Sequence, residues 1–312
     1  MKHPLNPDRS PLSTQAVVRF APSPNGPLHR GHALSALFNA ALAQKLGGRM
    51  LLRIEDIDPA RSRPEHIAMI EETLAWLGIA YERPVRRQSQ HMDDYAKAFA
   101  TLNAQGLVYP CFCTRGEINA EVQARGPTWP RDPDGTLLYP GPCRHRTNDR
   151  GAKGEAPQWR LDMAKAVALT GPLYWRSFDP ETGEVTHRSA DPARWGDVVL
   201  RRKDTPTSYH LSVVVDDDLQ GVTHIVRGVD LEAATDIHCV LQSLLGLPPP
   251  LYWHHALING PDGKKLAKSR GSESLASERA TGLTPSALYE ALQMSGVTNG
   301  LMNPENHQPQ AR

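Results

Sequence analysis

The sequence is poor in cysteine, in long apolar runs and in net charge. Four cysteines in 312 residues are too few for a disulfide-stapled scaffold. No apolar run approaches the ~18 residues of a membrane span, and the polar, proline-broken N-terminus lacks the apolar core of a signal peptide. We therefore expect a cytoplasmic protein without a membrane partner. Lys and Arg number 35 against 34 Asp and Glu, a balance that excludes a protein coating nucleic acid and leaves only local basic patches.

The chain does have length enough for about two domains and an alternating pattern of strands and helices. Strand-like segments at 16–21 and 50–54 alternate with helix-like segments at 33–46 and 64–78, and another helix-like segment follows at 91–105. This order predicts a parallel sheet of the nucleotide-binding type.

The pattern is interrupted in the middle of the chain. Residues 126–157 are rich in Gly, Pro, Arg and Asp and have few periodic apolar positions, which indicates an inserted module. Three strand-like segments follow, at 196–204, 209–217 and 223–228, before a helix-like segment at 231–246 that ends in glycine. We therefore expect one α/β domain split by an insertion.

A proline-rich loop between the first predicted strand and helix carries His29 and His32 on either side of Gly31. A loop that leads from a strand into a helix offers backbone N–H groups and the positive end of the helix dipole to a phosphate. The glycine permits close approach of a nucleotide, and imidazoles can donate to phosphate oxygens as charge builds there. The setting favours a phosphate site over the alternative, a proline-rich turn with incidental histidines.

A second motif lies near the end of the chain. Residues 264–270 contain four Lys and Arg residues, among them Lys265 and Lys268, directly after the glycine-flanked stretch 260–263. Such a loop can fold over an anionic ligand and neutralise a phosphoryl transition state. A basic run alone is usually a solvated surface loop, so its pairing with the His-x-Gly-His loop decides the interpretation.

Together these motifs resemble the two signatures of the class I aminoacyl-tRNA synthetases, at the expected places in the chain. Three further stretches resemble the glutamyl members of that family: RFAPSPNG at 19–26, RIEDID at 53–58, and VVDD with THIVRG within 214–228. Arg30 and Ala267 depart from the family pattern. The first is tolerable because the flanking histidines carry the chemistry, and the second removes a hydroxyl but no lysine.

The resemblance implies an α/β fold: a Rossmann-type parallel-sheet catalytic domain of the class I synthetases, split by a zinc-containing insertion, with a short helical C-terminal segment. The implied division is 15–110 and 201–270 for the two halves of the catalytic domain, 111–200 for the insertion with a zinc site and tRNA contact, and 271–312 for the helical segment and polar tail.

The family reaction begins when the α-carboxylate of L-glutamate attacks the α-phosphorus of ATP, and the glutamyl-adenylate then acylates a tRNA hydroxyl. The first step needs no general base because the carboxylate is already ionised, so the site must align the reactants and stabilise charge on phosphate. Mg²⁺ enters with ATP. By motif position the implied ATP-binding residues are His29, Gly31, His32, Lys265 and Lys268. All of these except Gly31 are catalytic candidates.

Glutamate recognition is implied for Arg19, Ser23, Glu55, Tyr209 and Arg227. Arginine forks pair with carboxylates, and Glu55 can accept from the α-ammonium group. Two alternatives stay open: Arg227 forms a salt bridge to Asp230 or Glu232, or Tyr209 is a core aromatic with a satisfied hydroxyl.

Neighbouring polar residues have structural interpretations. Asp216–Asp218, at the end of a predicted strand, is expected to be a turn with caps rather than a metal site. His254 and His255 are expected in a strand, where they point to opposite faces. Cys239 lies in a helix-like segment and is expected to be a small buried hydrophobe.

The other three cysteines, Cys111, Cys113 and Cys143, flank the insertion. In a reducing compartment, clustered thiols bind metal more often than they form disulfides, and a module with little apolar content gains folding energy from zinc. With Tyr139, the spacing resembles a Cys-x-Cys…Tyr-x-x-x-Cys arrangement in a short paralogue of the glutamyl-tRNA synthetases, which implies one structural Zn²⁺ on these four residues. Tyr139 is an unusual ligand, and water or His145 is the alternative.

Few residues follow Lys268: one helix is predicted at 284–295 and then a polar tail. An ordinary glutamyl-tRNA synthetase continues into a helical anticodon-binding portion. The chain thus resembles the short paralogues that activate glutamate without tRNA and place it on queuosine in the anticodon loop of tRNA(Asp). The implied partners are ATP, L-glutamate and queuosine-containing tRNA(Asp), and we expect a monomer. Basic residues within 144–160 and 201–203 are candidates for RNA contact.

Three other functions remain as alternatives. One is a minimal glutamyl-tRNA synthetase that charges the 3′ end of tRNA. Another is a small-molecule nucleotidyltransferase, which shares the His-x-Gly-His loop but leaves the glutamate-type motifs unexplained. The last is a non-catalytic RNA-binding paralogue, which would follow if Arg30 or Ala267 disabled the site.

Overall fold

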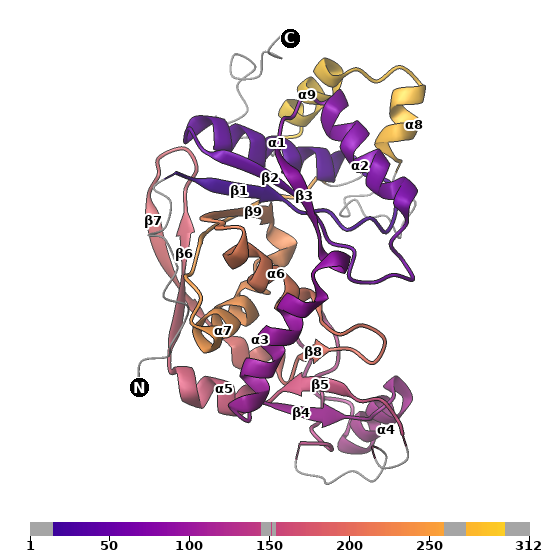
Figure 1. The fold of residues 1–312 in the computed structure, drawn as a ribbon, viewed down its shortest axis with the longest axis vertical. Coiled ribbons are helices and arrows are strands. Elements are labelled where there is room, and N and C mark those ends of the chain that lie inside the picture. Colours follow the sequence, from indigo (N-terminus) through magenta and orange to yellow (C-terminus); the bar gives the residue numbers. More distant parts are fainter. Residues whose placement is uncertain (1–14, 145–150, 152–153, 259–272, 297–312) are drawn as a thin grey trace.

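Short strands, the first two of them largely buried and apolar, pair in parallel in the upper part of the molecule (Figure 1). The computed structural model describes residues 15–144, 151, 154–258 and 273–296. Three strands pair in parallel in the order β1-β2-β3: β1 (Val17–Phe20), β2 (Arg49–Ile54) and β3 (Glu82–Arg87). Every residue of β1 is buried, as expected for a strand covered on both faces.

A second sheet adjoins the first. It has the order β7-β6-β10-β9 and consists of β6 (Leu173–Phe178), β7 (Val185–Ala190), β9 (His224–Gly228) and β10 (Leu251–His255). All of these strands are parallel except β7, which forms an antiparallel hairpin with β6. Strand β9 lies beside β1, because Thr223 N donates to Val17 O at 3.0 Å and Val17 N donates to Thr223 Oγ1 at 2.8 Å. The predicted parallel sheet is thus confirmed.

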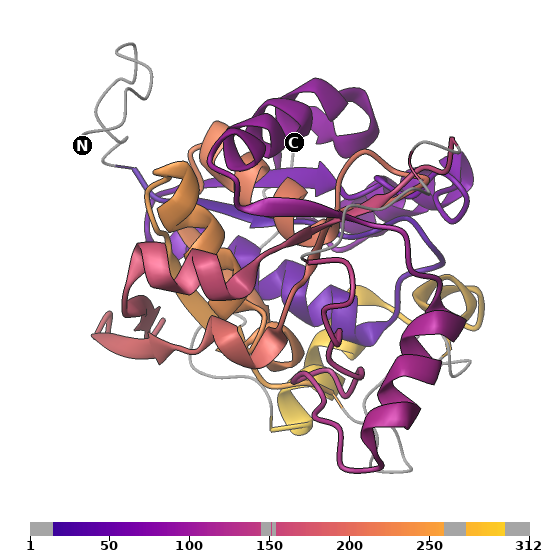
Figure 2. The same ribbon diagram turned by 90° about the horizontal axis from the view of Figure 1, so that it is seen from below.

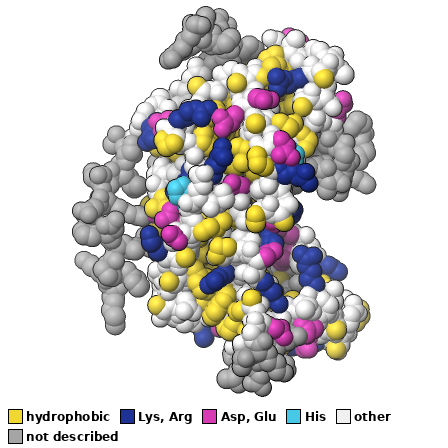
Figure 3. Space-filling model, turned by 45° about the vertical axis from the view of Figure 1, so that its right-hand side comes forward, with side chains coloured by type: hydrophobic (Ala, Val, Ile, Leu, Met, Phe, Trp, Pro, Cys, Tyr) yellow, Lys and Arg dark blue, Asp and Glu magenta, His cyan; other side chains and the backbone are white. Residues whose placement is uncertain are grey.

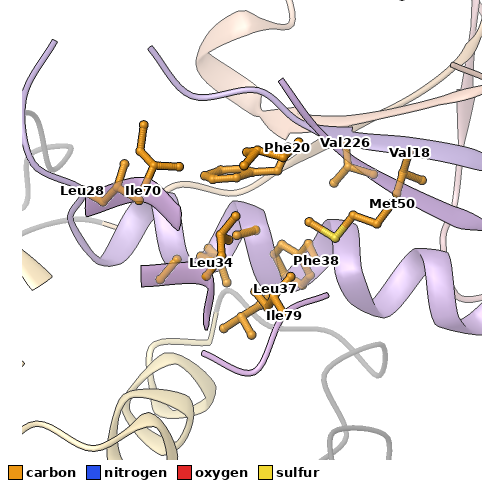
Figure 4. Packing of buried hydrophobic residues seen from close by; sticks show 14 of the residues in the cluster. Val18, Phe20, Leu28, Leu34, Leu37, Phe38, Met50, Ile70, Ile79 and Val226 are labelled. Atoms are coloured by element: carbon orange, nitrogen blue, oxygen red, sulfur yellow. The ribbon is translucent and has the colours of Figure 1, made fainter. Parts of the chain in front are cut away.

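Helix α1 (Arg30–Lys45) packs on this layer at the point where the two sheets meet. Figure 4 shows side chains from three strands and the helix packed together: Val18, Phe20, Met50, Val226, Leu34, Leu37 and Phe38. Burying a side chain such as Leu34 or Phe38 stabilises the fold by roughly 2 kcal/mol. Three more helices complete this core (Figure 1): α2 (Pro64–Trp76), α8 (Leu275–Ala280) and α9 (Pro285–Met294).

A second core occupies the other end of the molecule. It includes residues of α3 (Met92–Ala104), α5 (Met163–Thr170), α6 (Tyr209–Leu219) and α7 (Thr235–Leu245). The middle of the chain adds an antiparallel sheet in the order β4-β5-β8, made of β4 (Val108–Cys111), β5 (Gln158–Leu161) and β8 (Val199–Arg201). Helix α4 (Arg115–Arg125) lies at the edge of the molecule, apart from α5 (Figure 2). Short 3₁₀ helices lie at Gln88–Gln90, Pro192–Trp195 and Val229–Leu231.

Most predicted elements are confirmed. The helices predicted at 33–46, 64–78, 91–105, 231–246 and 284–295 correspond to α1, α2, α3, α7 and α9. Gly246 follows α7 in the left-handed conformation, with φ of 63°. Among the described residues, no helix combines the length and apolarity that crossing a membrane requires.

Two predictions about elements were wrong. The strand predicted at 209–217 is helix α6 instead, and Asp216–Asp218 lies within that helix rather than in a turn. The β-branched Val213–Val215 favour a strand locally, but Leu211–Asp217 is buried without interruption and packs between α3 and α7, so tertiary packing overrides propensity. The second error concerns the segment after Lys268, where the helix α8 was missed because it is only six residues long.

Candidate active site

A cavity of about 510 Å³ opens where the carboxyl ends of β1, β9 and β10 meet the starts of α1 and α6. Ligands of open α/β sheets bind at this edge, because parallel strands end there and helices begin there. All eight described candidates for binding ATP or glutamate line this one cavity: Arg19, Ser23, His29, Gly31, His32, Glu55, Tyr209 and Arg227. The other two candidates, Lys265 and Lys268, lie outside the described residues.

The two histidines of the His-x-Gly-His loop cap the first turn of α1. Nδ1 of His29 accepts from Gly31 N at 3.1 Å, and Nδ1 of His32 accepts from His29 N at 3.1 Å. Because both Nδ1 atoms accept, each neutral ring carries its proton on Nε2. A Cβ on Gly31 would come within 3.0 Å of the His29 ring, so only glycine leaves this ring in place. The loop therefore presents two Nε2–H donors at a helix start that already favours anions.

Arg19 and Glu55 belong to a buried charge network centred on Asp217 of α6. Oδ1 of Asp217 accepts from Nε of Arg19 at 3.0 Å and from Nη1 of Arg53 at 2.8 Å, and Nη2 of Arg53 contacts Oε1 of Glu55 at 3.4 Å. Burial raises the pKa of Asp217, but the two arginines outweigh it and hold this pKa below its usual range. Asp217 thus holds Arg19 directly, and Glu55 through Arg53, from behind the cavity.

Burial also acts on Glu55 itself. It raises the pKa of the Glu55 carboxyl, against the opposing effect of Arg53 and Arg19. An ammonium group bound beside this carboxylate would stabilise its ionised form. The cavity therefore has a site for a cation at Glu55, next to cationic side chains suited to carboxylates.

Arg227 of β9 is buried at the other wall of the cavity and has only neutral partners. Nη2 donates to Thr235 Oγ1 at 2.7 Å, Nη1 to His238 Nδ1 at 3.2 Å and Nε to His254 Nε2 at 3.2 Å. No carboxylate in the described part of the chain forms an ion pair with it. The alternative of a salt bridge to Asp230 or Glu232 is therefore wrong.

Tyr209, the first residue of α6, lines the cavity and is half-buried. Burial raises the pKa of its hydroxyl, so the phenol is neutral and able to donate. Its ring packs against His210 and His238, with centroids 5.3 and 5.8 Å away. Tyr209 thus both packs beside the core and borders the cavity.

Sequence reasoning missed four residues that hold these side chains: Arg53, Asp217, Thr235 and His238. Arg53 lies inside a recognised motif, so its charge was a signal that went unused. Asp217 was interpreted as part of a turn, and nothing local marks Thr235 or His238. The expected alternation of His254 and His255 is confirmed, since the His254 ring packs against Trp175 of β6 and the His255 ring packs against Phe38 of α1.

The three cysteines flanking the insertion come together at the end of β4. Their sulfur atoms lie within 4.8 Å of one another, with Sγ of Cys113 and Cys143 3.4 Å apart. The Tyr139 hydroxyl lies 3.3 Å from Sγ of Cys111 and 3.6 Å from Sγ of Cys113. A tetrahedral zinc with bonds of about 2.3 Å to sulfur and about 2.0 Å to oxygen would separate its ligand atoms by roughly 3.5–3.8 Å. The four side chains therefore fit such an ion.

The surroundings of the cluster modify its acidity. Burial raises the pKa of Cys111, but the Tyr139 hydroxyl and the Arg160 guanidinium outweigh it and lower this pKa to about 7. Burial raises the pKa of Cys113 to about 12. Arg160 also lies over the Tyr139 ring at 3.9 Å from its centroid, where it compensates negative charge in the cluster. His145, the alternative ligand, lies outside the described residues.

Comparison with known protein families gives one match over nearly the whole chain. The profile of the family described as tRNA synthetases class I (E and Q), catalytic domain, matches residues 15–307.

Curated proteins and solved structures agree with this match. The chain is 46% identical over 277 residues to the glutamyl-Q tRNA(Asp) synthetase of Rhodobacter capsulatus, covering 86% of this chain and 96% of that protein. It is 41% identical over 266 residues to the protein of the same name from Geobacter sulfurreducens, covering 84% and 78%. The crystal structure of the glutamate-tRNA synthetase from Elizabethkingia anophelis is similar with a TM-score of 0.65 at 28% identity. This match covers 82% of the present chain but only 53% of that one, so the chain spans about half of the longer synthetase.

Proposed function

The chain belongs to the class I tRNA synthetases of the glutamate and glutamine group, and from this membership we propose that it activates glutamate with ATP and transfers it to queuosine in tRNA(Asp). The observation that carries the proposal is the single cavity that joins Arg19, Glu55 and Arg227 to the two histidines at the start of α1. One end of it suits an acidic amino acid and the other suits a phosphate chain. The relatives named glutamyl-Q tRNA(Asp) synthetase support the choice of acceptor.

In the first step the α-carboxylate oxygen of glutamate attacks the α-phosphorus of ATP, a P–O bond forms, and pyrophosphate leaves with the electrons of the bond that breaks. The product is glutamyl-adenylate. Arg19 and Glu55 hold the α-carboxylate and the α-ammonium, Ser23 and Tyr209 border them, and Arg227 pairs with the side-chain carboxylate. This binding places the nucleophile, and it needs no proton transfer.

The Nε2–H groups of His29 and His32 donate to phosphate oxygens, whose negative charge grows in the transition state. Gly31 N–H and the dipole of α1 add to the same field. Lys265 and Lys268 are assigned to the same phosphates by their motif, and Mg²⁺ enters with ATP. In the second step a queuosine hydroxyl attacks the carbonyl carbon of the adenylate and AMP leaves.

The RNA substrate needs a surface as well as a cavity. The face of the molecule in Figure 3 is hollowed at its right-hand edge, and Lys and Arg side chains lie above and below the hollow. Such a distribution attracts a phosphate backbone. The whole molecule has a net charge of only +1, so this local arrangement carries the attraction.

A zinc ion on Cys111, Cys113, Tyr139 and Cys143 is part of the proposal, supported by the spacing of their donor atoms. The metal would tie β4 to the loop that follows α4, a structural role. Elemental analysis of the purified protein is expected to give one zinc per chain. Cys143→Ser is expected to lose it, whereas Cys239→Ala, a change at the cysteine outside the cluster, is expected to keep it. Equal metal contents in the two variants would contradict the site.

The chemistry is tested by glutamate-dependent exchange of pyrophosphate into ATP without tRNA. We expect exchange with glutamate, and its absence from folded protein would overturn the activation step. The acceptor is tested with labelled glutamate and tRNA(Asp) with and without queuosine. Label should appear only on the modified tRNA, and label on the 3′-terminal adenosine of tRNA(Glu) would instead identify a minimal glutamyl-tRNA synthetase.

A further inference from the structure

The charges at the amino-acid end of the cavity do not cancel. Arg19 and Arg53 share the carboxylate of Asp217, and Arg53 also lies 3.4 Å from Glu55 and 3.9 Å from Asp216, so both of these cations have carboxylate partners. Arg227 has no such partner among the described residues. Asp230 lines the same cavity but forms no ion pair with Arg227. In the described part of the chain Arg227 is therefore a cation without a carboxylate partner, and it is buried, since it is only 5% exposed.

The three partners of Arg227 accept hydrogen bonds from its guanidinium but carry no negative charge that would neutralise it. A guanidinium only donates, so Nδ1 of His238 and Nε2 of His254, which face it at 3.2 Å, must both be unprotonated. Nε2 of His238 then carries the proton and donates to Nδ1 of His210 at 3.3 Å. Oγ1 of Thr235 accepts from Nη2 and lies 3.2 Å from Nε2 of His254, the atom that accepts from Nε of Arg227. Each ring is thus held in one neutral form.

The acidity of the histidines agrees with this arrangement. Burial, followed by the charge of Arg227, lowers the pKa of His254 to about 2 and that of His210 to about 4, and moves the pKa of His238 well below its usual value. Three of the five N–H groups of Arg227 are used by Thr235, His238 and His254. Two remain, enough for a forked pair with a carboxylate.

We propose that His238 and His254 are specificity-determining positioning residues, which hold Arg227 through uncharged acceptors so that the ligand's own side-chain carboxylate becomes its counter-ion. The inference rests on the proposed function and deepens it. Glutamate carries one net negative charge and balances the site, whereas glutamine is neutral overall and leaves a buried cation unpaired. An acceptor with a negative charge at position 238 or 254 would remove this preference.

At His238, substitution by Asn and substitution by Asp introduce side chains of nearly the same shape that differ in charge. Asn keeps a neutral acceptor, and Asp supplies the missing carboxylate. The readout is pyrophosphate exchange, measured as kcat and KM for glutamate, glutamine and ATP. For His238→Asn we expect a glutamate-to-glutamine ratio of kcat/KM within about threefold of the wild-type ratio. For His238→Asp we expect this ratio to fall at least about tenfold, through a higher glutamate KM with an unchanged ATP KM.

The same pair at position 254, His254→Asn and His254→Asp, repeats the test at a half-buried site and decides the matter if His238→Asp does not fold. An Asp variant that keeps the wild-type ratio would overturn the proposal, and so would an Asn variant that loses as much as its Asp counterpart. If the wild-type protein exchanges pyrophosphate with glutamate but the variants give one of these contrary results, the proposal for His238 and His254 fails and the proposed function still holds. Wild-type protein without exchange would overturn both.

Discussion

Asp217 does not line the cavity, yet it holds Arg19, which does, and Arg53, which contacts Glu55 in the cavity wall. Its carboxylate is 5% exposed and accepts from Arg19 and Arg53, which come from β1 and β2. A single buried acceptor therefore aligns the ends of two parallel strands. The contacts span 198 and 164 positions of sequence, which explains why no local pattern indicates them.

Replacement of Asp217 by Asn should cost both stability and affinity. Asn keeps the shape but leaves two buried arginines without their shared anion, so we expect the free energy of unfolding to fall by about 3 kcal/mol. The KM for glutamate should rise more than the KM for ATP, because Arg19 and Glu55, which Asp217 holds directly and through Arg53, lie at the amino-acid end. Urea unfolding and pyrophosphate exchange measure the two effects. Glu121→Gln, in an exposed pair with Arg125, is the control and should change neither.

We expect the free energy of unfolding to fall between pH 6.5 and about pH 4 because of His210. Burial and Arg227 lower the pKa of His210 from 6.5 to about 4 in the folded protein. Between these values the unfolded chain takes up a proton that the folded protein does not, so stability is full above pH 6.5 and declines as pH falls toward 4.

The contribution of this one residue is about 1.4 kcal/mol per pH unit within that window. Urea unfolding at several pH values should give a shallower decline for His210→Gln than for the wild type. His187→Gln, on the exposed strand β7, is the matched control. Identical slopes for the wild type and His210→Gln would show that this histidine is not held neutral.

At the scale of elements, α8 is joined to the start of α1. Arg30, the residue within the predicted His-x-Gly-His loop, donates from Nε to Oε1 of Glu278 at 2.7 Å. Leu275 N donates to Leu28 O at 2.9 Å, and both leucines are buried in the core beneath. The departure at Arg30 thus has a structural counterpart in a segment that follows the lysine motif.

A double-mutant cycle of Arg30→Met and Glu278→Gln should give a coupling free energy of about 1 kcal/mol. The value is modest because the Arg30 side chain is 38% exposed, although that of Glu278 is only 11% exposed. The cycle for Arg49 and Glu82, whose side chains are 39% and 42% exposed, is the comparison and should give about half as much or less. Equal coupling free energies in both cycles would mean that the ion pair between α1 and α8 contributes no more to stability than an exposed ion pair.

Elements were predictable from sequence where local periodicity and packing agree. Helices α1, α2 and α7 have strong helix formers, a proline or glycine at an end, and an apolar face. Helix α6 was not predictable, because its three consecutive valines favour a strand and only its position between α3 and α7 makes it helical.

For the candidate site, the residues inside contiguous motifs could be identified from sequence alone. His29, His32 and Glu55 follow strands, and a strand end is a reliable place for a ligand. The residues that hold them in place come from other elements. Thr235 and His238 lie only 8 and 11 positions after Arg227, but no local pattern indicates that the start of α7 returns them to its guanidinium.

At the scale of the molecule, the cysteine cluster lies in the lower part of Figure 1, among β4, β5 and α4, whereas α1 and β1 lie in the upper part. The two regions have separate cores. We therefore expect activation of glutamate and docking of RNA to respond differently to damage in the lower region.

Cys143→Ser should keep at least about half of the wild-type pyrophosphate exchange, since the cavity is built elsewhere. Transfer of glutamate to tRNA should fall at least about tenfold, because the lower region would lose its cross-link and the surface that it offers to RNA. Cys239→Ala should retain both activities. A parallel loss of exchange and transfer in Cys143→Ser would mean that the cluster supports the whole fold instead.

The imidazoles of His29 and His32 cap the start of α1, and both residues also line the cavity. The same short segment therefore serves the stability of the helix and the proposed binding of phosphate. A substitution there removes a helix cap, worth about 1 kcal/mol, together with one of the proposed donors to phosphate. Loss of activity in a variant of His29 or His32 therefore does not by itself distinguish a folding defect from a defect in phosphate binding. Loss of stability does not distinguish them either.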